Sequence, residues 1–265
     1  MEIKSYKNYA DHIRKLVLDL IYSAKTSHVG SALSCVDIFT ALYAAVDLKK
    51  IQENYLDRDR IILSKGHGIA AQLAALCEYG LLSREEIMNG FCRPGSVFPE
   101  NTAAYTPYVE IPTGSLGQGV SFAIGAAYGM KLRNFGQSRA FAILGDGELN
   151  EGQCWEAFQQ ASYHRLDNLV ILIDANGLAG INETCGNQMV LEKMKAFGFE
   201  AEIIDGHDVD TMIAMIKRKN ESGKPLAYVC NTVKGYGISF MENDNDWHYR
   251  PISETDYVKA LEELA

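Results

Sequence analysis

The chain has 265 residues with 25 basic and 34 acidic side chains, which gives a formal net charge of −9 at pH 7. Its 47% hydrophobic and 22% charged residues are typical of a globular protein and exclude intrinsic disorder or a fibrous repeat. The negative charge argues against a protein that binds nucleic acid or an anionic membrane surface, because such proteins usually carry basic patches. The negative net charge does not exclude a small phosphorylated ligand, since local groups can bind an anion inside an acidic protein.

The six cysteines are scattered and form no CxxC pair, so a zinc ribbon and a thioredoxin-like motif are excluded. Residues 1–20 lack the apolar segment and cleavage site of a secretory signal. No stretch approaches the roughly 20 apolar residues of a membrane span. We therefore expect reduced cysteines and a cytoplasmic protein with no membrane contact.

The first part of the chain predicts helices and one short strand. Apolar spacing predicts helices over residues 6–24 and 34–46, with Ser34 as a candidate N-cap of the second. A strand over 60–63 runs into a glycine-rich segment, which is followed by a helix over 69–79. Residues 91–113 hold four of the six prolines and predict a loop.

The second part of the chain alternates strands with helices. A glycine-rich turn over 114–119 opens a helix of small residues over 121–130. The predicted strands are 140–144, 169–173, one that ends at Ile203–Ile204, and 226–233, with helices over 151–164 and 208–219. Continuous apolar strands spaced by helices predict the α/β class: a parallel sheet covered by helices on both faces. We expect one domain over residues 1–265.

Polar and glycine-rich segments follow four of the predicted strands. They are 64–68, 145–147, 174–177 and 234–237. The carboxyl ends of parallel strands lie at one edge of the sheet, where open α/β sheets bind their ligands. The sequence therefore predicts a ligand site at this edge.

Two of these segments offer groups for an anion and a cation. Gly147 lets backbone amides approach an anion. Asp146 and, after the next strand, Asn176 offer oxygen ligands of the kind that Mg²⁺ takes together with substrate phosphate. Two capped turns would give the same pattern, so the spacing leaves both interpretations open. A dinucleotide site is disfavoured because Gly145-x-Gly147-x-x-Asn150 lacks the third glycine.

Three histidines lie in predicted loops or at element ends, beside glycine or aromatic residues: His28, His67 and His248. A lone histidine is more often structural, but three at the ligand end of a sheet favour a functional role. Histidines donate to diphosphate oxygens and exchange protons near neutral pH. We assign structural roles to His12, His164 and His207. The sequence has no G-x-S-x-G, Walker A or HExxH motif.

Along almost its whole length the chain resembles the N-terminal, diphosphate-binding part of transketolase. The strongest element is Gly145-Asp146-Gly147 followed about 30 residues later by Asn176, which is similar to the thiamine diphosphate motif. The segments 59–68, 113–119 and 234–237 are each similar to a transketolase block and stand in the family's order. The set together is specific to the transketolase branch of thiamine enzymes.

The resemblance implies thiamine diphosphate and Mg²⁺, or Ca²⁺ in its place, as cofactors. The implied metal ligands are Asp146, Asn176 and the backbone carbonyl of Leu178. The implied cofactor contacts are His67, Gly114, Ser115, Leu116, Gly145, Asp146, Gly147, Glu148, Asn176 and His248. The implied catalytic residues are His67, His248, His28, which would face the sugar donor, and Glu151, which matches a glutamate at the family's subunit interface.

A complete transketolase continues beyond the length matched here with a pyrimidine-binding domain and a third domain. The glutamate that activates the aminopyrimidine ring lies in that further part. The resemblance therefore implies one subunit of a two-chain enzyme, assembled as a dimer of heterodimers with a partner that carries the pyrimidine-binding domain. The implied reaction transfers a two-carbon ketol unit from a ketose or ketose phosphate to an aldehyde.

Two alternatives stay open. One is a subunit of another thiamine enzyme, such as a 2-oxoacid dehydrogenase or an enzyme like deoxyxylulose-phosphate synthase. The other is a non-catalytic subunit that binds the cofactor. Phe98 bears on the choice because it stands where the family usually has a histidine that contacts the donor sugar. A phenylalanine cannot exchange a proton, which indicates a different donor, a different acceptor or a specialised pathway.

Overall fold

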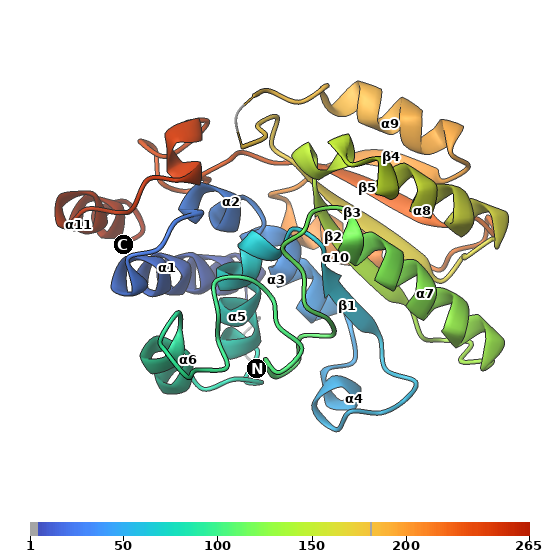
Figure 1. Ribbon diagram of the computed structural model, residues 1–265, viewed down its shortest axis with the longest axis horizontal. Coiled ribbons are helices and arrows are strands. Elements are labelled where there is room, and N and C mark those ends of the chain that lie inside the picture. The colour runs from blue at the N-terminus through green and yellow to red at the C-terminus, as the bar shows by residue number, and fades with distance from the viewer. Residues whose placement is uncertain (1–4, 181) are drawn as a thin grey trace.

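The computed structural model describes residues 5–180 and 182–265, and a five-stranded parallel sheet forms its centre (Figure 1). The strands are β1 (Arg60–Leu63), β2 (Ala140–Gly145), β3 (Leu169–Ala175), β4 (Glu200–Asp205) and β5 (Leu226–Asn231). Their order across the sheet is β1-β2-β3-β5-β4, and every neighbouring pair is parallel. The predicted class, a parallel α/β sheet, is confirmed.

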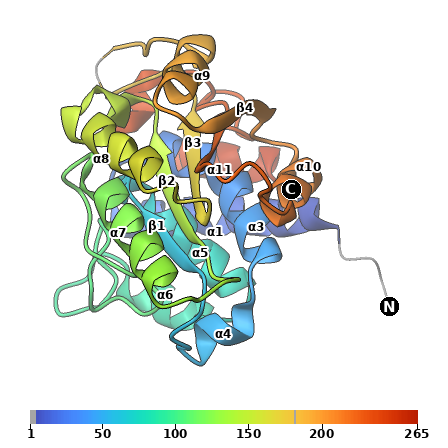
Figure 2. The same cartoon turned by 90° about the vertical axis from the view of Figure 1, so that its right-hand side faces the viewer.

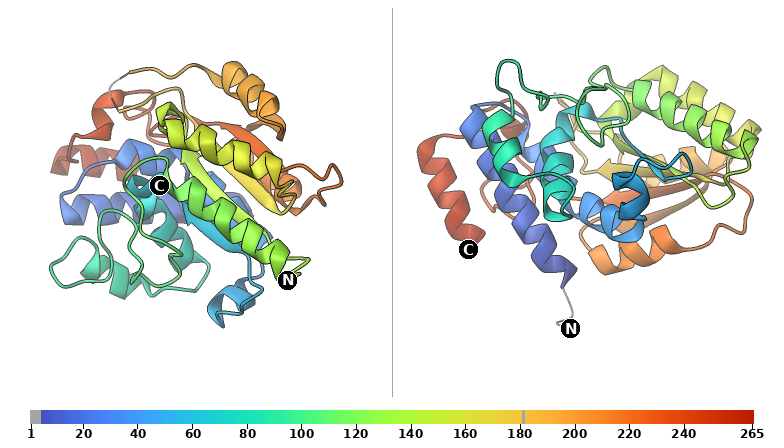
Figure 3. Two further views of the ribbon diagram at one scale, coloured as in Figure 1. Left: turned by 45° about the vertical axis from the view of Figure 1, so that its right-hand side comes forward. Right: turned by 90° about the horizontal axis from the view of Figure 1, so that it is seen from below.

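Helices cover both faces of this sheet, as Figure 2 shows. The α-helices are α1 (Tyr6–Ala24), α2 (Val29–Ser34), α3 (Val36–Ala45), α4 (Leu48–Gln52), α5 (Ile69–Glu78), α6 (Arg84–Gly90), α7 (Gln118–Leu132), α8 (Gly152–Tyr163), α9 (Asn187–Ala196), α10 (Val209–Lys217) and α11 (Glu254–Glu263). Three short 3₁₀ helices are η1 (Gly66–Gly68), η2 (Gly147–Asn150) and η3 (Asn245–His248). Figure 3 shows α7 and α8 side by side across one face.

Alternation along the strands divides the core into two apolar layers. Phe141 and Ile143 of β2 point toward the layer that contains α1, α3, α5 and α10. Ala142 and Leu144 point to the other layer, against α7, α8 and α9. Because both faces are covered, each central strand is apolar except near its carboxyl end, where β3 contains Asp174 and β5 ends at Asn231, and this is why the strands were recognisable in the sequence.

The predicted strands and the main helices are present with end shifts of a few residues. The sequence analysis did not identify α2, α4, α6, α9 or α11. The prediction that Ser34 caps the helix after it is wrong. Ser34 is the last residue of α2, and its hydroxyl donates to the Ser31 carbonyl and to Asp174. Cys35 precedes α3 instead, without a side-chain cap.

The carboxyl ends of β1, β2, β3 and β5 lie at one edge of the sheet, and each leads directly into a polar loop or a 3₁₀ turn. The irregular segment 91–117 contains neither helix nor strand, as predicted, and contributes to the same edge. In the described part of the chain no helix is long and apolar enough to cross a membrane.

Candidate active site

A cavity of about 320 Å³ opens at the carboxyl edge of the sheet. It is lined by 11 of the 13 residues that the sequence assigned to the site: His28, His67, Gly114, Leu116, Gly145, Asp146, Gly147, Glu148, Asn176, Leu178 and His248. These residues come from loops after three different strands, from the turn before α7, from the start of α2 and from η3. The fold therefore brings together side chains up to 220 residues apart in the chain, from 28 to 248.

Asp146 follows β2 and is almost fully buried, with 4% of its surface exposed. Its Oδ2 accepts hydrogen bonds from the Gly177 amide at 2.7 Å and the Thr184 hydroxyl at 2.9 Å. Burial, and then the nearby Asp174, raise the pKa of the Asp146 carboxyl, and these hydrogen bonds only partly offset the shift. A buried carboxylate with no cationic partner is costly, so the position suits a bound cation.

The loop after β3 supplies the other oxygens. Asn176 keeps its side-chain oxygen at 3.1 Å from the Leu178 amide, and the main chain of Gly147 packs against Ala179. A Cβ on Gly147 would approach Ala179 Cβ to 3.0 Å, so the two loops touch because residue 147 has no side chain. Carboxylate, amide and carbonyl oxygens are the donors that Mg²⁺ prefers. In the described residues no trio of His, Cys, Asp or Glu is arranged for a metal.

The three predicted histidines form a cluster. The ring centroids of His28 and His67 are 5.3 Å apart, those of His28 and His248 are 5.1 Å apart, and those of His67 and His248 are 5.6 Å apart. His28 has a left-handed backbone, with φ of 71°, and its amide donates to the His248 carbonyl at 3.0 Å. This main-chain bond ties the start of α2 to η3.

Two buried lysines lie behind the histidines. Lys65 pairs with Asp174 and donates to the Ser31 carbonyl at 2.9 Å. Lys234 donates to Asn245 Oδ1 at 2.7 Å and lies 3.1 Å from His248 Nδ1. Both lysines are at most 1% exposed. The two lysines thus place positive charge beside the carboxylates of Asp174 and Asp146.

The cluster holds its histidines neutral. Burial, and then Lys234 and the neighbouring His28, lower the pKa of His248 to about 4. Burial and Lys65 lower the pKa of His67 well below its ordinary range. Burial, followed by Lys65, lowers the pKa of Lys234 to about 8. A bound polyanion would reverse these shifts, because it favours the protonated forms.

Glu148 also lines the cavity, but its carboxylate is hydrogen-bonded to other groups of the protein. It accepts hydrogen bonds from the Ser64 hydroxyl, from the Gly117 amide at 2.7 Å and from the Gly145 amide at 3.3 Å. These bonds hold the turn before α7 against the end of β2.

Two predicted site residues lie outside the cavity. Ser115 is exposed in the turn before α7, and Glu151 is exposed at the start of α8.

Several lining residues were not identified as site residues from the sequence, among them Ser31, Lys65, Asn101 and Tyr249. The sequence contained an indication that Lys65 belongs to the site, since it is a charged residue two positions after the end of a buried strand. It contained none for Asn101, because that residue lies in the irregular segment 91–117. Phe98, in the same segment, is 6% exposed and packs in the apolar layer rather than in the cavity.

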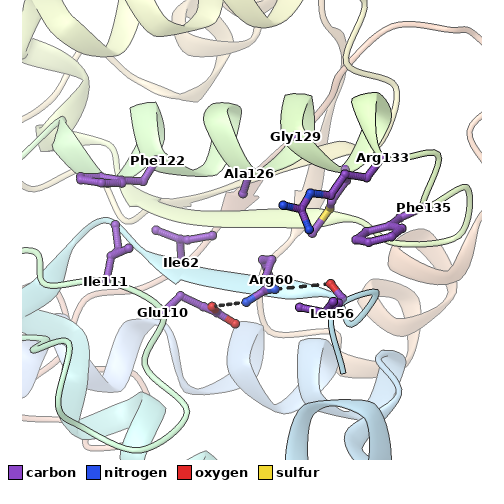
Figure 4. A pocket seen from close by; sticks show the side chains of 11 residues that line it. Leu56, Arg60, Ile62, Glu110, Ile111, Phe122, Ala126, Gly129, Arg133 and Phe135 are labelled. Atoms are coloured by element: carbon purple, nitrogen blue, oxygen red, sulfur yellow. Dashed lines mark hydrogen bonds and ion pairs between the residues drawn. The ribbon is translucent and has the colours of Figure 1, made fainter. Parts of the chain in front are cut away.

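A second hollow, of about 380 Å³, lies between β1 and α7 (Figure 4). Its wall is largely apolar and includes Ile62 and Phe122. Arg60 donates to Glu110 at 2.9 Å and to the Leu56 carbonyl at 3.4 Å, so these polar groups satisfy one another (Figure 4). The converging polar groups that mark a catalytic site lie instead at the strand ends.

Comparison with protein families matches residues 5–264 to the family described as transketolase, thiamine diphosphate binding domain. A similar protein is the 6-deoxy-6-sulfo-D-fructose transketolase subunit SqwG of Clostridium sp. (strain MSTE9), 36% identical over 97% of this chain and 95% of the relative. An apulose-4-phosphate transketolase subunit of Phocaeicola vulgatus is 32% identical over 100% of this chain and 94% of the relative.

Among solved structures, the transketolase of Campylobacter jejuni superposes with a TM-score of 0.88 and 31% sequence identity. The match covers 100% of this chain and 43% of the Campylobacter chain. The chain thus spans almost the whole of the two subunit relatives and less than half of the single-chain transketolase.

Proposed function

The chain belongs to the transketolase family, as the subunit with the thiamine diphosphate-binding domain of a two-chain enzyme, and from this we propose its reaction and site. The proposed reaction transfers a two-carbon ketol unit from a sugar or sugar-phosphate donor to an aldehyde acceptor. One observation carries it: the buried Asp146 carboxylate and the three clustered histidines face the same cavity at the strand ends.

In this proposal the Asp146 carboxylate, the Asn176 amide oxygen and the Leu178 carbonyl hold Mg²⁺. His67, His248 and the backbone at Gly147 contact the diphosphate. The imidazoles then donate hydrogen bonds to the diphosphate and Lys234 offsets part of its charge, in a site largely shielded from water, where each interaction is stronger than in water. Bound thiamine diphosphate supplies a carbanion that adds to a ketose carbonyl, chemistry that no amino-acid side chain provides.

The chain's own part in catalysis is to anchor, orient and move protons. In this proposal His28 faces the donor sugar. Since it is held neutral, it can accept a proton or a hydrogen bond from a sugar hydroxyl near pH 7. Gly114 and Leu116 line the same cavity and leave an apolar surface for the cofactor rings.

The relatives' names suggest the substrate class. One relative is named for 6-deoxy-6-sulfo-D-fructose and another for apulose-4-phosphate. We infer an anionic sugar as donor or acceptor, with a cytoplasmic partner subunit that carries the pyrimidine-binding domain. Phe98 leaves the cavity without a side chain at the position of the family histidine, which supports a specialised donor.

The proposal is tested by calorimetry of the chain, assembled with its partner subunit, with thiamine diphosphate and Mg²⁺. Asp146→Asn removes the charged metal ligand but keeps the side-chain shape, and it should abolish measurable binding. The expected loss is large because the carboxylate interacts directly with the cation.

Asp210→Asn is the matched control, since Asp210 is an exposed residue in the first turn of α10. It should bind thiamine diphosphate as the unmodified chain does. Undiminished affinity in Asp146→Asn would contradict the assigned site, and failure of the unmodified chain to bind would contradict the function.

A further inference from the structure

The residue of interest is Glu100, which the sequence did not single out. It lies in the irregular segment 91–117, two residues after the buried Phe98. Its side chain is 41% exposed, against 20% for His28, and it is not among the residues that line the cavity. The carboxylate therefore lies behind His28, on the side away from the cofactor site.

Residues next to His28 hold this carboxylate in place. Glu100 Oε1 accepts from the Thr26 hydroxyl, from the Ser27 hydroxyl at 3.1 Å and from the Ser27 amide at 3.5 Å. These bonds lower the pKa of Glu100 despite its partial burial, so the group is an anion at neutral pH. An ionised carboxylate can only accept hydrogen bonds.

The same atoms fix the proton on His28. His28 Nδ1 lies 2.9 Å from Ser27 Oγ and 3.3 Å from Glu100 Oε1. The Ser27 hydroxyl has one proton, and the carboxylate can only accept. If Nδ1 were unprotonated, its lone pair would face the carboxylate, so Nδ1 carries the hydrogen. The neutral ring then presents an unprotonated Nε2, for which the described residues offer no hydrogen-bond partner.

We propose that Glu100 is a positioning residue that fixes the orientation and tautomer of His28, so that Nε2 is presented to the cavity as a hydrogen-bond acceptor. Its natural ligand is a hydroxyl group, as a polyhydroxylated substrate carries. The identity of that substrate rests on the proposed function, but the tautomer does not. Glu100 thus contributes to donor recognition without touching the substrate.

Several groups besides Glu100 act on the His28 ring, and they are Lys65, Lys234, His67, His248 and Tyr249. Burial lowers the pKa of His28, Glu100 counteracts this, and the two lysines lower it further. Removal of the Glu100 charge should therefore lower the pKa of His28 again and weaken the preference for the proton on Nδ1.

The test is ¹⁵N NMR of the histidine side chains in the full chain, with His28 assigned by comparison with His28→Gln. The unmodified chain should show a protonated Nδ1 and an unprotonated Nε2 near neutral pH. Glu100→Gln should lower the His28 pKa and move population toward the other tautomer. Glu221→Gln is the control, because it removes an equal charge from an exposed loop before β5.

Identical titration and ¹⁵N shifts in Glu100→Gln would overturn the proposal and leave Glu100 a purely structural role. If that variant does not fold, Glu100→Asp serves, because its shorter side chain withdraws the carboxylate from His28 Nδ1, and unchanged shifts there would overturn the proposal equally. In the assembled enzyme, Glu100→Gln should lower kcat/KM for the donor by at least about tenfold, with thiamine diphosphate affinity unchanged. If the chain binds no thiamine diphosphate but shows the expected His28 shifts, the proposed function is contradicted and the role of Glu100 is not.

Discussion

The site depends on ionisable side chains whose environments set their charge. His248 lies between the buried Lys234 and the neighbouring His28, and this environment keeps its imidazole neutral at pH values where a free histidine is protonated. The folded chain maintains this neutral imidazole at a cost in stability below its ordinary pKa, because burial and the nearby positive charge oppose protonation.

This cost has a measurable dependence on pH. The pKa of His248 is about 4 in the folded chain, against an ordinary value of 6.5, so between these values the unfolded chain binds a proton that the folded chain does not. The free energy of unfolding should therefore fall as the pH drops from 6.5 toward 4. Urea denaturation across this range should show a shallower fall for His248→Gln. Above pH 7 the free energies of unfolding of the two proteins should differ by a constant amount. If His248→Gln shows the same slope of unfolding free energy against pH as the unmodified chain below pH 7, the lowered pKa of His248 is refuted.

At this scale the sequence predicted what short motifs encode. Asp146 and Asn176 directly follow strands and His67 lies four residues after one, so their positions follow from the topology. Glu100 could not be identified from the sequence, because the irregular segment 91–117 has no periodicity from which the path of the backbone can be inferred. Ser34 was misjudged for a related reason: its partner, Asp174, is 140 residues away in the sequence. The roles given to Ser115 and Glu151 stay predictions.

At the scale of elements, the approach of α7 to β1 depends on a glycine. A Cβ on Gly119 would come within 2.6 Å of the Ser64 main chain and hydroxyl. Ser64 in turn donates to Glu148, which holds the turn before α7. A side chain at position 119 would push the start of α7 away from the strand end and from the cavity beside it.

Two alanine substitutions in α7 should have opposite effects. Gly119→Ala should lower the free energy of unfolding by about 1–3 kcal/mol, the usual cost of overpacking. Gly125→Ala should raise it by about 0.5–1 kcal/mol, because a Cβ there meets nothing within 4 Å and alanine favours the helix. Urea denaturation of the isolated chain measures both free energies of unfolding. Equal effects of the two substitutions would show that the close contact with Ser64 does not exclude a side chain at position 119.

The elements themselves were predictable in proportion to their burial. The apolar strands β2 and β3 and the amphipathic α1 had clear patterns, since a buried face imposes one. In contrast, α9 and α11 have few buried residues, Val190 and Met194 in α9 and Ala260 in α11, so no apolar stripe marked them. The count of one domain over residues 1–265 stays a prediction.

On the scale of the whole molecule, α7 and α8 expose large apolar side chains. Phe122 is 51% exposed, Leu132 is 67% exposed and Tyr163 is 79% exposed. This is consistent with the proposed dimer of heterodimers, in which such a face is covered by a second copy.

The assembly can be measured by light scattering of the chain purified together with its partner subunit. The mass should correspond to two copies of each chain. Phe122→Glu places a charge on the exposed face and should reduce the assembly to one copy of each. Lys259→Glu changes the charge of the remote helix α11 and serves as control. An assembly that keeps its mass in Phe122→Glu would exclude this face as the interface.

The strand order has a consequence for synthesis on the ribosome. The helices α1, α3 and α5 are made first, yet the sheet they cover is complete only when β5 (Leu226–Asn231) emerges. Between the end of β1 at Leu63 and the end of β5 the ribosome adds 231 − 63 = 168 residues, which takes about 10–30 s at the usual rate of elongation. Throughout that interval the apolar faces of the early helices can pack only on one another and on an incomplete sheet, so part of this apolar surface stays exposed on the nascent chain.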